Sequence, residues 1–368
     1  MKIAVDLRRI ENPGIGRYMK NLFRTICRLD QSNEYLLIVP PGYDGFRSDS
    51  EHVQVVPDGS KYYSLREQWV LPRLLAREAA ELFHSPHFLL PWRCPCPSVV
   101  TIHDIIYLVF EQDLPSFVGR QYYRFQIGFS ARHSNAIITD SEFSRTEIVK
   151  HLGVPADKIR VIYCAPDPQF QKTDSRQAES HVAERFGIHP PYLFNVGLQL
   201  QRKNLQRLVE AFAELGERRK GFQLILAGPF GPIKGQLESL VARKNLQEAV
   251  RFLGPVTDFD LVALYNSATA LVFPSLYEGF GFPVVEAFAC GIPVITSNIS
   301  SLPELAGDAA LLVDPTKVEE ISEAMGRVIG DEDLRRSLIE KGFVQVQKFT
   351  WERTARHTLD VYRQLLAA

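Results

Sequence analysis

The amino-acid sequence predicts an α/β protein built from two doubly wound parallel sheets. Three observations support this prediction. Short apolar runs alternate with amphipathic stretches along most of the chain, polar side chains directly follow several of these runs, and a proline-rich polar segment interrupts the alternation near the middle. Alternation of strands with helices is typical of parallel sheets. The 368 residues have room for two such domains, at about 100–200 residues each.

The first half of the chain opens with the apolar run 2–6, which predicts a strand. The stretch 17–29 is expected to be a helix, because its apolar residues recur at spacings of three and four. They are Tyr18, Leu22, Ile26 and Leu29. Further strands are expected at 35–39, 98–102 and 136–139, and a further helix at 143–151.

The second half repeats this scheme. Strands are expected at 192–196, 222–227, 250–253, 270–273 and 293–296, with helical patterns between them. The polar segment 166–191 lacks a strand pattern and contains Pro166, Pro168, Pro190 and Pro191. We interpret it as the linker and entry to a second domain. The expected domains are therefore residues 1–172 and 178–349.

Composition and charge restrict the function classes. The 42 basic and 43 acidic residues give a net charge of −1, so no global positive field exists to hold nucleic acid. The apolar runs are far shorter than the roughly 18–20 residues of a membrane span, and Asp6, Arg8 and Arg9 interrupt the place where the apolar core of a secretory signal would sit. Five scattered cysteines favour reduced thiols and a cytoplasmic protein.

The segment 273–286 is the richest in chemistry. It follows an apolar strand and carries Glu278 in a loop, Gly279 and Gly281 on either side of Phe280, and Glu286 one turn inside the next helix. Helix N-termini bind anions, and carboxylates accept hydrogen bonds from paired sugar hydroxyls. This combination suits a ligand with phosphate and polyol parts. The alternative is that Glu286 only complements the helix dipole and Glu278 is a solvated loop residue.

Two cations lie between a strand and a helix in the segment 196–204. Arg202 and Lys203 are expected at the start of that helix, where positive charge opposes the helix dipole. An anion such as a diphosphate would explain this placement, because Arg binds phosphate bidentately and Lys contributes a point charge. Two solvated surface cations remain the alternative.

Polar side chains also follow a strand in the first half. His103 and Asp104 come at its end, where a histidine could hydrogen-bond a substrate hydroxyl or transfer a proton; a structural His–Asp pair is the alternative. His84 and His87 are interpreted as structural. Glycines 14 and 16 would let backbone approach a phosphate, but position 19 is Met and no acidic residue follows the next strand. A nicotinamide oxidoreductase is therefore disfavoured.

These motifs together resemble glycosyltransferase family 4, whose members are retaining enzymes of the GT-B fold. The string from Glu278 to Glu286 resembles that family's E-x(7)-E motif. The resemblance covers nearly the whole chain. Within the family, the chain is similar to the bacterial mannosyltransferases. The segments that carry the resemblance include 14–16, 101–104, 140–144, 201–204, 301–305 and 349–351. It implies two Rossmann-like domains facing across a cleft, with a C-terminal helix at 350–368 returning to the first domain.

The resemblance also implies a role for each site residue. Arg202 and Lys203 would hold the donor diphosphate, and Glu286 would bind the nucleotide ribose. Glu278 and the backbone of Gly279, Phe280 and Gly281 would hold the donor sugar. His103 would face that sugar, and Gly16 would approach the phosphates. The departing phosphate oxygen would take the acceptor's proton, without a bound metal or a cofactor. Many members carry Arg where this chain has Leu198, which leaves the division of labour between the two cations open.

The expected function is transfer of a hexose, with a slight preference for mannose, from a GDP- or UDP-linked sugar to a glycan or lipid-linked acceptor. The alternatives are a nucleotide-sugar epimerase of the same fold and a non-catalytic nucleotide-sugar-binding subunit. Basic and apolar residues alternate in two stretches, one in the first helix and one around Trp69. Peripheral contact with the cytoplasmic face of a membrane and ordinary packing on the sheet both remain open for these stretches.

Overall fold

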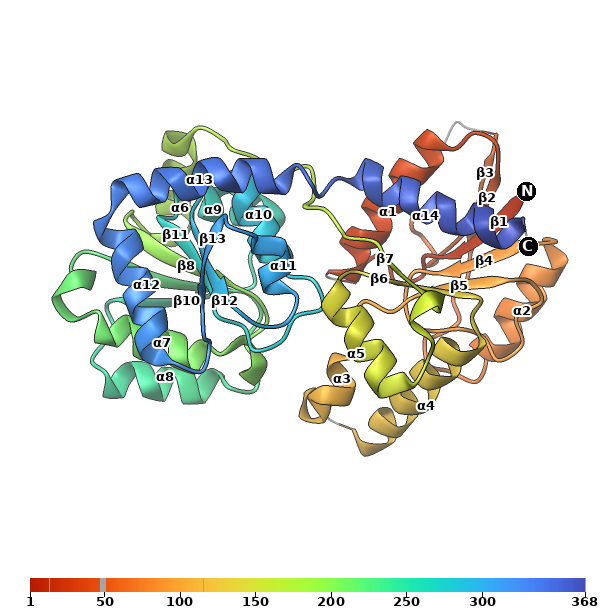
Figure 1. Ribbon diagram of the computed structural model, residues 1–368, viewed down its shortest axis with the longest axis horizontal. Coiled ribbons are helices and arrows are strands. Elements are labelled where there is room, and N and C mark those ends of the chain that lie inside the picture. Colours follow the sequence, from red (N-terminus) through yellow and green to blue (C-terminus); the bar gives the residue numbers. More distant parts are fainter. Residues whose placement is uncertain (13, 47–50, 115, 368) are drawn as a thin grey trace. The chain divides into compact units, whose positions relative to one another are not determined.

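The structure, a computed structural model, describes residues 1–12, 14–46, 51–114 and 116–367. The chain folds into two compact units (Figure 1). Residues 1–164 and the C-terminal helix form the first unit, and residues 165–349 form the second. Both units contain a parallel sheet covered by helices, so the expected fold class is confirmed.

The sheet of the first unit has the order β3-β2-β1-β4-β5-β6-β7 among the described residues. All of its pairings are parallel. Its strands are β1 (Lys2–Asp6), β2 (Glu34–Val39), β3 (Val53–Pro57), β4 (Leu82–Ser85), β5 (Ser98–Thr101), β6 (Ala136–Thr139) and β7 (Ile159–Val161). The order reverses between β1 and β4, which makes the carboxyl ends of these strands the expected place for a ligand.

Two layers of helices cover this sheet (Figure 1). On one face, α2 (Glu67–Arg77), α4 (Phe117–His133) and α5 (Glu142–Leu152) share an apolar core with the strands. The short α3 (Ile106–Val109) precedes α4. On the other face, α1 (Ile15–Leu29) packs against α14 (Trp351–Leu366). The contact of Tyr18 with Trp351, at 6.1 Å between ring centroids, ties the C-terminal helix to this unit.

The sheet of the second unit has the order β10-β9-β8-β11-β12-β13 in the described part of the chain. It is also entirely parallel. Its strands are β8 (Tyr192–Val196), β9 (Gln223–Ala227), β10 (Val250–Gly254), β11 (Ala270–Phe273), β12 (Val294–Ser297) and β13 (Ala310–Val313). The order reverses between β8 and β11, and both of these strands lead into the loops that carry the predicted donor residues.

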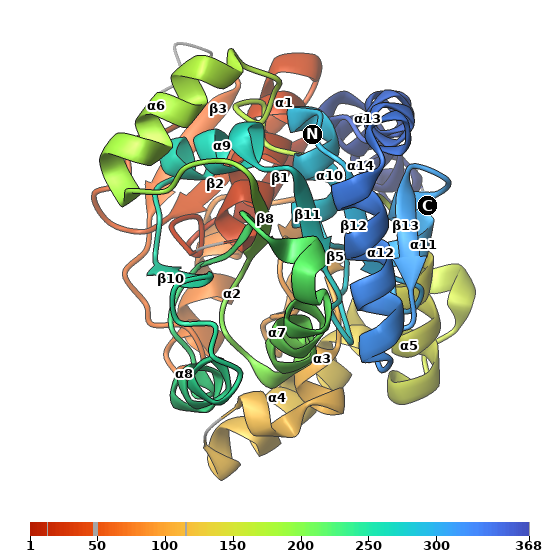
Figure 2. The ribbon, with the colours of Figure 1, turned by 90° about the vertical axis from the view of Figure 1, so that its left-hand side faces the viewer.

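Helices flank both faces of the second sheet (Figures 1 and 2). One face is covered by α7 (Leu205–Glu214), α8 (Lys234–Arg243) and α12 (Val318–Gly330), which share one apolar core with the strands. On the other, α6 (Ser175–Phe186), α9 (Asp258–Ser267) and α10 (Phe282–Cys290) lie together, and α13 (Glu332–Val346) packs on α10. The short α11 (Leu302–Ala306) follows β12. None of the helices in the described residues is long and apolar enough to cross a membrane.

The interpretation of 166–191 as a linker is wrong. This segment contains α6, whose Val182 is fully buried, and α6 packs against α9. The segment was misread because α6 is polar on its exposed faces and buries a narrow stripe. Residues 165–172 also belong to the second unit, since Asn266 donates to the Gln171 carbonyl and accepts from the backbone N–H of Thr173.

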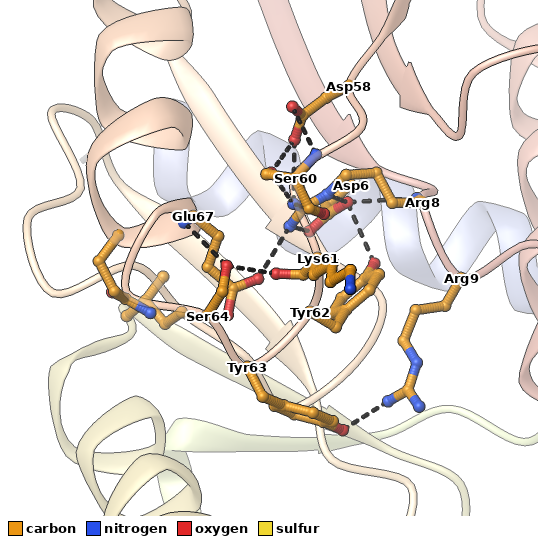
Figure 3. A network of polar contacts seen from close by, with 12 residues as sticks. Asp6, Arg8, Arg9, Asp58, Ser60, Lys61, Tyr62, Tyr63, Ser64 and Glu67 are labelled. Carbon is orange, nitrogen blue, oxygen red and sulfur yellow. Dashed lines mark hydrogen bonds and ion pairs between the residues drawn. The ribbon is translucent and has the colours of Figure 1, made fainter.

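A buried ion network fixes the loop after β1 (Figure 3). The guanidinium of Arg8 donates to both carboxylate oxygens of Asp6, at 2.8 and 2.7 Å, and to Asp58 at 3.0 Å. It also approaches Glu67, at the start of α2, to 3.4 Å. Burial raises the pKa of Glu67 to about 7. Arg8 therefore connects the ends of β1 and β3 to the first turn of α2.

Candidate functional site

Arg202 and Lys203 lie in a 3-10 turn (Gln201–Lys203) between β8 and α7. The sequence predicted both cations at the start of the helix. The helix begins only at Leu205, so the two cations precede it. Asn204 separates them from the helix in a left-handed conformation, with φ of 59°. Its side-chain amide donates to the carbonyls of Pro274 and Pro315, at 3.0 and 2.6 Å. This amide anchors the cationic turn to the loop after β11.

Glu278 lies in that loop after β11, where three serines hold it. The Ser275 hydroxyl donates to Glu278 Oε1 at 2.6 Å. The backbone N–H of Glu278 donates to Ser300 Oγ at 3.2 Å, and Ser301 Oγ donates to the Glu278 carbonyl at 3.0 Å. The carboxylate is therefore fixed through both its side chain and its backbone, as a preorganised group requires.

The structure brings the two cations and this carboxylate together. Lys203 Nζ lies 2.6 Å from Glu278 Oε1, and Arg202 Nη1 lies 3.7 Å from Oε2. Burial alone would raise the pKa of Glu278, but the charges of Lys203 and then Arg202 outweigh it and lower that pKa. Glu278 is therefore ionised at neutral pH. It is a buried counter-ion, which excludes the alternatives of a solvated loop residue and two solvated surface cations.

The residues after Glu278 bring the chain into α10. Gly281 caps the helix with φ of 119°, and a Cβ built there would lie 2.7 Å from Leu302 Cδ2. Only glycine fits this position, for conformational and steric reasons. Phe280 is buried between Phe282 and Phe349, at 5.1 and 6.0 Å between ring centroids. The Phe280 ring is therefore part of the apolar packing of this unit, and its carbonyl accepts a hydrogen bond from Ser301 Oγ at 2.5 Å.

Glu286 lies one turn inside α10 and is buried. The hydroxyl of Tyr265, from α9, donates to its Oε2 at 3.0 Å. Tyr265 is itself fully buried and packs edge-on against Phe194 of β8. A tyrosine from a different helix therefore orients this carboxylate, so Glu286 does more than complement the dipole of its own helix.

In the first unit, His103 follows β5 and is held from two sides. Its Nδ1 lies 2.7 Å from Asp140 Oδ2 and its Nε2 lies 3.3 Å from the Pro86 carbonyl. Burial alone would lower the pKa of His103, but the charge and hydrogen bond of Asp140 outweigh it, and the pKa is raised. Asp104 instead accepts from the backbone N–H of Ile106 at 2.8 Å.

Gly16 lies in the first turn of α1, with no room for a side chain. A Cβ there would lie 2.2 Å from the Ile10 carbonyl oxygen, and its N–H donates to the Asn12 carbonyl at 2.8 Å. The backbone that approaches Gly16 closely is thus that of the loop preceding α1. His84 is buried between Tyr362 OH and Thr101 Oγ1, at 2.6 and 2.9 Å. This position agrees with a structural role.

Sequence reasoning missed several contributors to the site, among them the Tyr265 hydroxyl that orients Glu286. Asp140 is the partner of His103, and Ser275 and Ser300 hold Glu278. Asp140 directly follows β6, which pairs with β5, so the carboxyl ends of adjacent strands were the available signal. Ser275 has a similar signal, because it comes two residues after β11. Within residues 1–12, 14–46, 51–114 and 116–367, no group of three or more His, Cys, Asp or Glu could hold a metal ion.

Two parallel Rossmann-like sheets with these loops define the class of GT-B glycosyltransferases. A model described as Glycosyl transferases group 1 matches residues 177–345, and one described as Glycosyltransferase Family 4 matches residues 14–170. The chain belongs to glycosyltransferase family 4, and the expected class of enzyme, a hexosyltransferase, is confirmed.

Curated relatives support this assignment. The chain is 34% identical over 285 residues to the O-antigen chain mannosyltransferase B of Escherichia coli, covering 77% of this chain and 74% of the relative. It is 29% identical over 286 residues to the serotype-specific mannosyltransferase WbdA of the same species. That match covers 75% of this chain but 34% of WbdA, so the chain spans about a third of that relative's length.

Solved structures share the fold. The sucrose-phosphate synthase from Thermosynechococcus elongatus has a TM-score of 0.78 and 22% identity, and the match covers 100% of this chain and 99% of that one. HepE from Anabaena, in complex with UDP and glucose, has a TM-score of 0.78 and 19% identity, over 99% of this chain and 100% of that one. At these identities the likeness concerns the fold.

Proposed function

We propose that this enzyme transfers mannose, with retention of configuration, from GDP-mannose to a glycan or lipid-linked acceptor. The arrangement that carries the proposal is the buried cluster of Lys203, Arg202 and Glu278, which gathers two cations and one ionised carboxylate at the carboxyl edge of the second sheet. The relatives reported above carry transferase names, which favours transfer over an epimerase or a non-catalytic binding subunit.

In this proposal Lys203 and Arg202 bind the donor diphosphate and stabilise the charge that develops on it as it leaves. The bond between the anomeric carbon and the phosphate oxygen breaks, and a bond from the acceptor oxygen forms on the same face of the sugar. The proton of the acceptor hydroxyl goes to the departing phosphate oxygen. Two fixed cations supply leaving-group stabilisation of the kind that a metal ion provides in other transferases, so the proposed reaction needs no divalent metal.

The carboxylates have separate tasks. Glu278 and the backbone of Gly279, Phe280 and Gly281 bind the hydroxyls of the donor sugar, and Glu286 binds the ribose of the nucleotide. The ionised state of Glu278 supports the first task, because a carboxylate accepts hydrogen bonds from two hydroxyls at once. His103 is assigned to the sugar and Gly16 to the phosphates by the family resemblance. These assignments are the part of the proposal that site-directed variants must test.

Mannose and GDP are preferred because the curated relatives named above are mannosyltransferases. UDP-linked sugars are the competing donors, and HepE was solved with UDP and glucose. The proposed compartment is the cytoplasm. The five cysteines support it, since each is a free thiol, as expected in a reducing environment.

A thermal-shift panel tests the proposal. The purified chain is heated with GDP, UDP, ADP and their sugars, in the presence and absence of magnesium. Ligands that bind the native state raise its melting temperature, and we expect the largest rise with GDP and GDP-mannose, equal with and without magnesium. A larger rise with UDP compounds would change the donor. A rise that requires magnesium would overturn the metal-independent reaction, and no rise with any nucleotide would overturn the binding site.

A further inference from the structure

Two helices of the first unit expose an unusual set of side chains. The exposed face of α2 presents Arg66, the N-cap residue that precedes the helix, and then Trp69 and Arg73 one turn apart. Trp69 is 60% exposed, and the guanidinium of Arg73 lies 5.8 Å from the centre of its ring. The single acidic residue of α2, Glu67, is fully buried in the network around Arg8. The exposed face of this helix is therefore basic and aromatic.

A second helix continues this surface. The 17 residues of α4 include Arg120, Arg124 and Arg132 and no Asp or Glu. Its outer face exposes Phe125, which is 53% exposed. Its first turn exposes Phe117 and Val118, at 68% and 75%. Side chains of this size and polarity are rarely left so open in a row unless a partner covers them.

Trp92 joins the two helices into one surface. Its backbone N–H donates to Gln68 Oε1 of α2 at 2.8 Å, and its indole N–H donates to Gln126 Oε1 of α4 at 3.2 Å. Its ring meets Phe125 edge-on, at 6.2 Å between centroids. We define the basic–aromatic surface as Arg66, Trp69, Arg73, Trp92, Arg93 and Phe125.

The charge of this surface has one sign. Arg66, Arg73 and Arg93 make no ion pair with the residues that the structure describes, whereas Arg77 and Arg124, beside them, are paired with Glu78 and Glu111. In the first helix, by contrast, Arg28 is paired with Glu352 of α14 and the helix packs on α14. The sequence left both basic stretches open as membrane contacts, and the structure favours the one around Trp69.

We propose that the basic–aromatic surface docks the enzyme on an anionic lipid bilayer. Arginines attract anionic headgroups, while tryptophan and phenylalanine insert at the boundary between headgroups and acyl chains. Phe117 and Val118 add apolar side chains without a polar handle, which suit an acyl environment better than stacking on nucleic-acid bases. Charge complementarity and projecting apolar groups together therefore favour lipid over a nucleic acid.

The position of this surface gives docking a purpose. The chain enters α2 from the carboxyl end of β3, and it enters α4 after β5 and His103. Arg66, Phe117 and Val118 are therefore at the helix ends nearest the carboxyl edge of the sheet, where His103 lies. Docking would bring this edge to the bilayer and favour a lipid-linked acceptor, an extension that rests on the proposed function. The docking surface itself does not depend on it.

The experiment measures sedimentation of the full chain with vesicles of phosphatidylcholine, alone or mixed with phosphatidylglycerol. Wild type should sediment with the mixed vesicles and stay in solution with phosphatidylcholine alone. R73E/R93E should lower the partition coefficient at least about 30-fold, since each arginine near an anionic surface contributes about fivefold and each added glutamate is repelled by the same surface. W69S/F125S should lower it as well. Two of the three tryptophans, Trp69 and Trp92, lie in this surface, so binding should also shift tryptophan emission to the blue.

Matched controls separate docking from folding and from catalysis. R356E changes an exposed arginine of α14, and F259S removes an exposed phenylalanine of α9; both should sediment as wild type does. All variants should keep the wild-type melting temperature and nucleotide binding. The proposal is overturned if wild type does not sediment with the mixed vesicles, sediments equally with both kinds, or loses no binding in R73E/R93E. If the wild type binds no nucleotide, the proposed function is overturned, but the docking proposal is not affected.

Discussion

Lys203 Nζ and Glu278 Oε1 lie 2.6 Å apart, although 75 residues separate them in the chain. One residue comes from the turn after β8 and the other from the loop after β11. These strands are neighbours in the second sheet, so their carboxyl ends meet. The ion pair fixes both loops in one geometry, with Arg202 as a second cation at 3.7 Å. A charged ligand arriving here meets groups that are already oriented.

Replacing Glu278 by Gln should separate binding from transfer. The amide keeps the size of the side chain but loses the charge that pairs with Lys203, so two cations remain for the diphosphate. We expect nucleotide diphosphate affinity to stay within about threefold of wild type, while the transfer rate falls about 100-fold or more. Calorimetry and a transfer assay measure the two quantities. Equal loss of both would contradict the role of Glu278 in holding the sugar.

Asp140→Asn should lower the pKa of His103, because it removes a carboxylate 2.7 Å from the ring. The raised pKa of His103 contributes stability that is fully present below the unfolded-state pKa of about 6.5 and is lost as pH rises through the folded-state pKa. The variant should therefore lose most stability in acid and less at alkaline pH.

NMR titration of the histidine rings measures that pKa directly. Asp104→Asn is the matched control, because the Asp104 carboxylate accepts from the backbone N–H of Ile106 and its charge raises the pKa of His103 less than that of Asp140 does. It should lower the pKa of His103 much less than Asp140→Asn does. An equal effect of the two variants would contradict the assignment of Asp140 as the partner of His103.

Gly16→Ala should lower the free energy of unfolding of the protein. The added methyl would overlap the Ile10 carbonyl oxygen, and overpacking of this kind costs about 1–3 kcal/mol. Gly235→Ala is the control, because nothing lies within 4 Å of its Cβ position and alanine favours helix. Denaturant unfolding measures both. If Gly16→Ala keeps wild-type stability but loses nucleotide binding, the glycine serves the ligand rather than the loop.

Arg8→Met should destabilise the first unit by about 3–5 kcal/mol, since it leaves Asp6 and Asp58 without their buried counter-ion. Arg9→Met changes the neighbouring, partly exposed arginine, which donates to the Tyr63 hydroxyl (Figure 3) and lies 2.8 Å from His87 Nε2. It should cost much less. Thermal unfolding checks the comparison, and a similar loss in both variants would contradict the importance of the buried network.

The sequence was sufficient for the strands that border the two sites. The runs 2–6, 136–139, 192–196 and 270–273 became strands with the expected bounds. These strands are almost entirely buried and mostly apolar, which makes them visible as short apolar runs. The missed strands are β3, β4, β7 and β13. Strands β3, β7 and β13 lie at edges of the two sheets and are partly exposed, and β4 is buried but short, with His84 and Ser85 as two of its four residues.

The site was predictable in its residues but not in its contacts. The charged side chains after β8 and β11 could be found by position, because the carboxyl ends of strands carry the ligand site in doubly wound sheets. Which carboxylate pairs with which cation depends on the order of the strands in the sheet. Local hydrophobic periodicity does not predict that order. For the same reason the sequence suggested Asp104, next to His103, as the partner of this histidine. In the structure the partner is Asp140, which follows the adjacent strand.

The most direct test of the account is calorimetric binding of the preferred nucleotide diphosphate to Lys203→Met. The loss of a charge-assisted contact predicts affinity about 10- to 100-fold weaker than wild type. Lys234→Met, which removes a partly exposed lysine of α8, should bind as wild type does. Unchanged affinity in Lys203→Met, with a wild-type melting temperature, would contradict the claim that the cations after β8 hold the donor diphosphate.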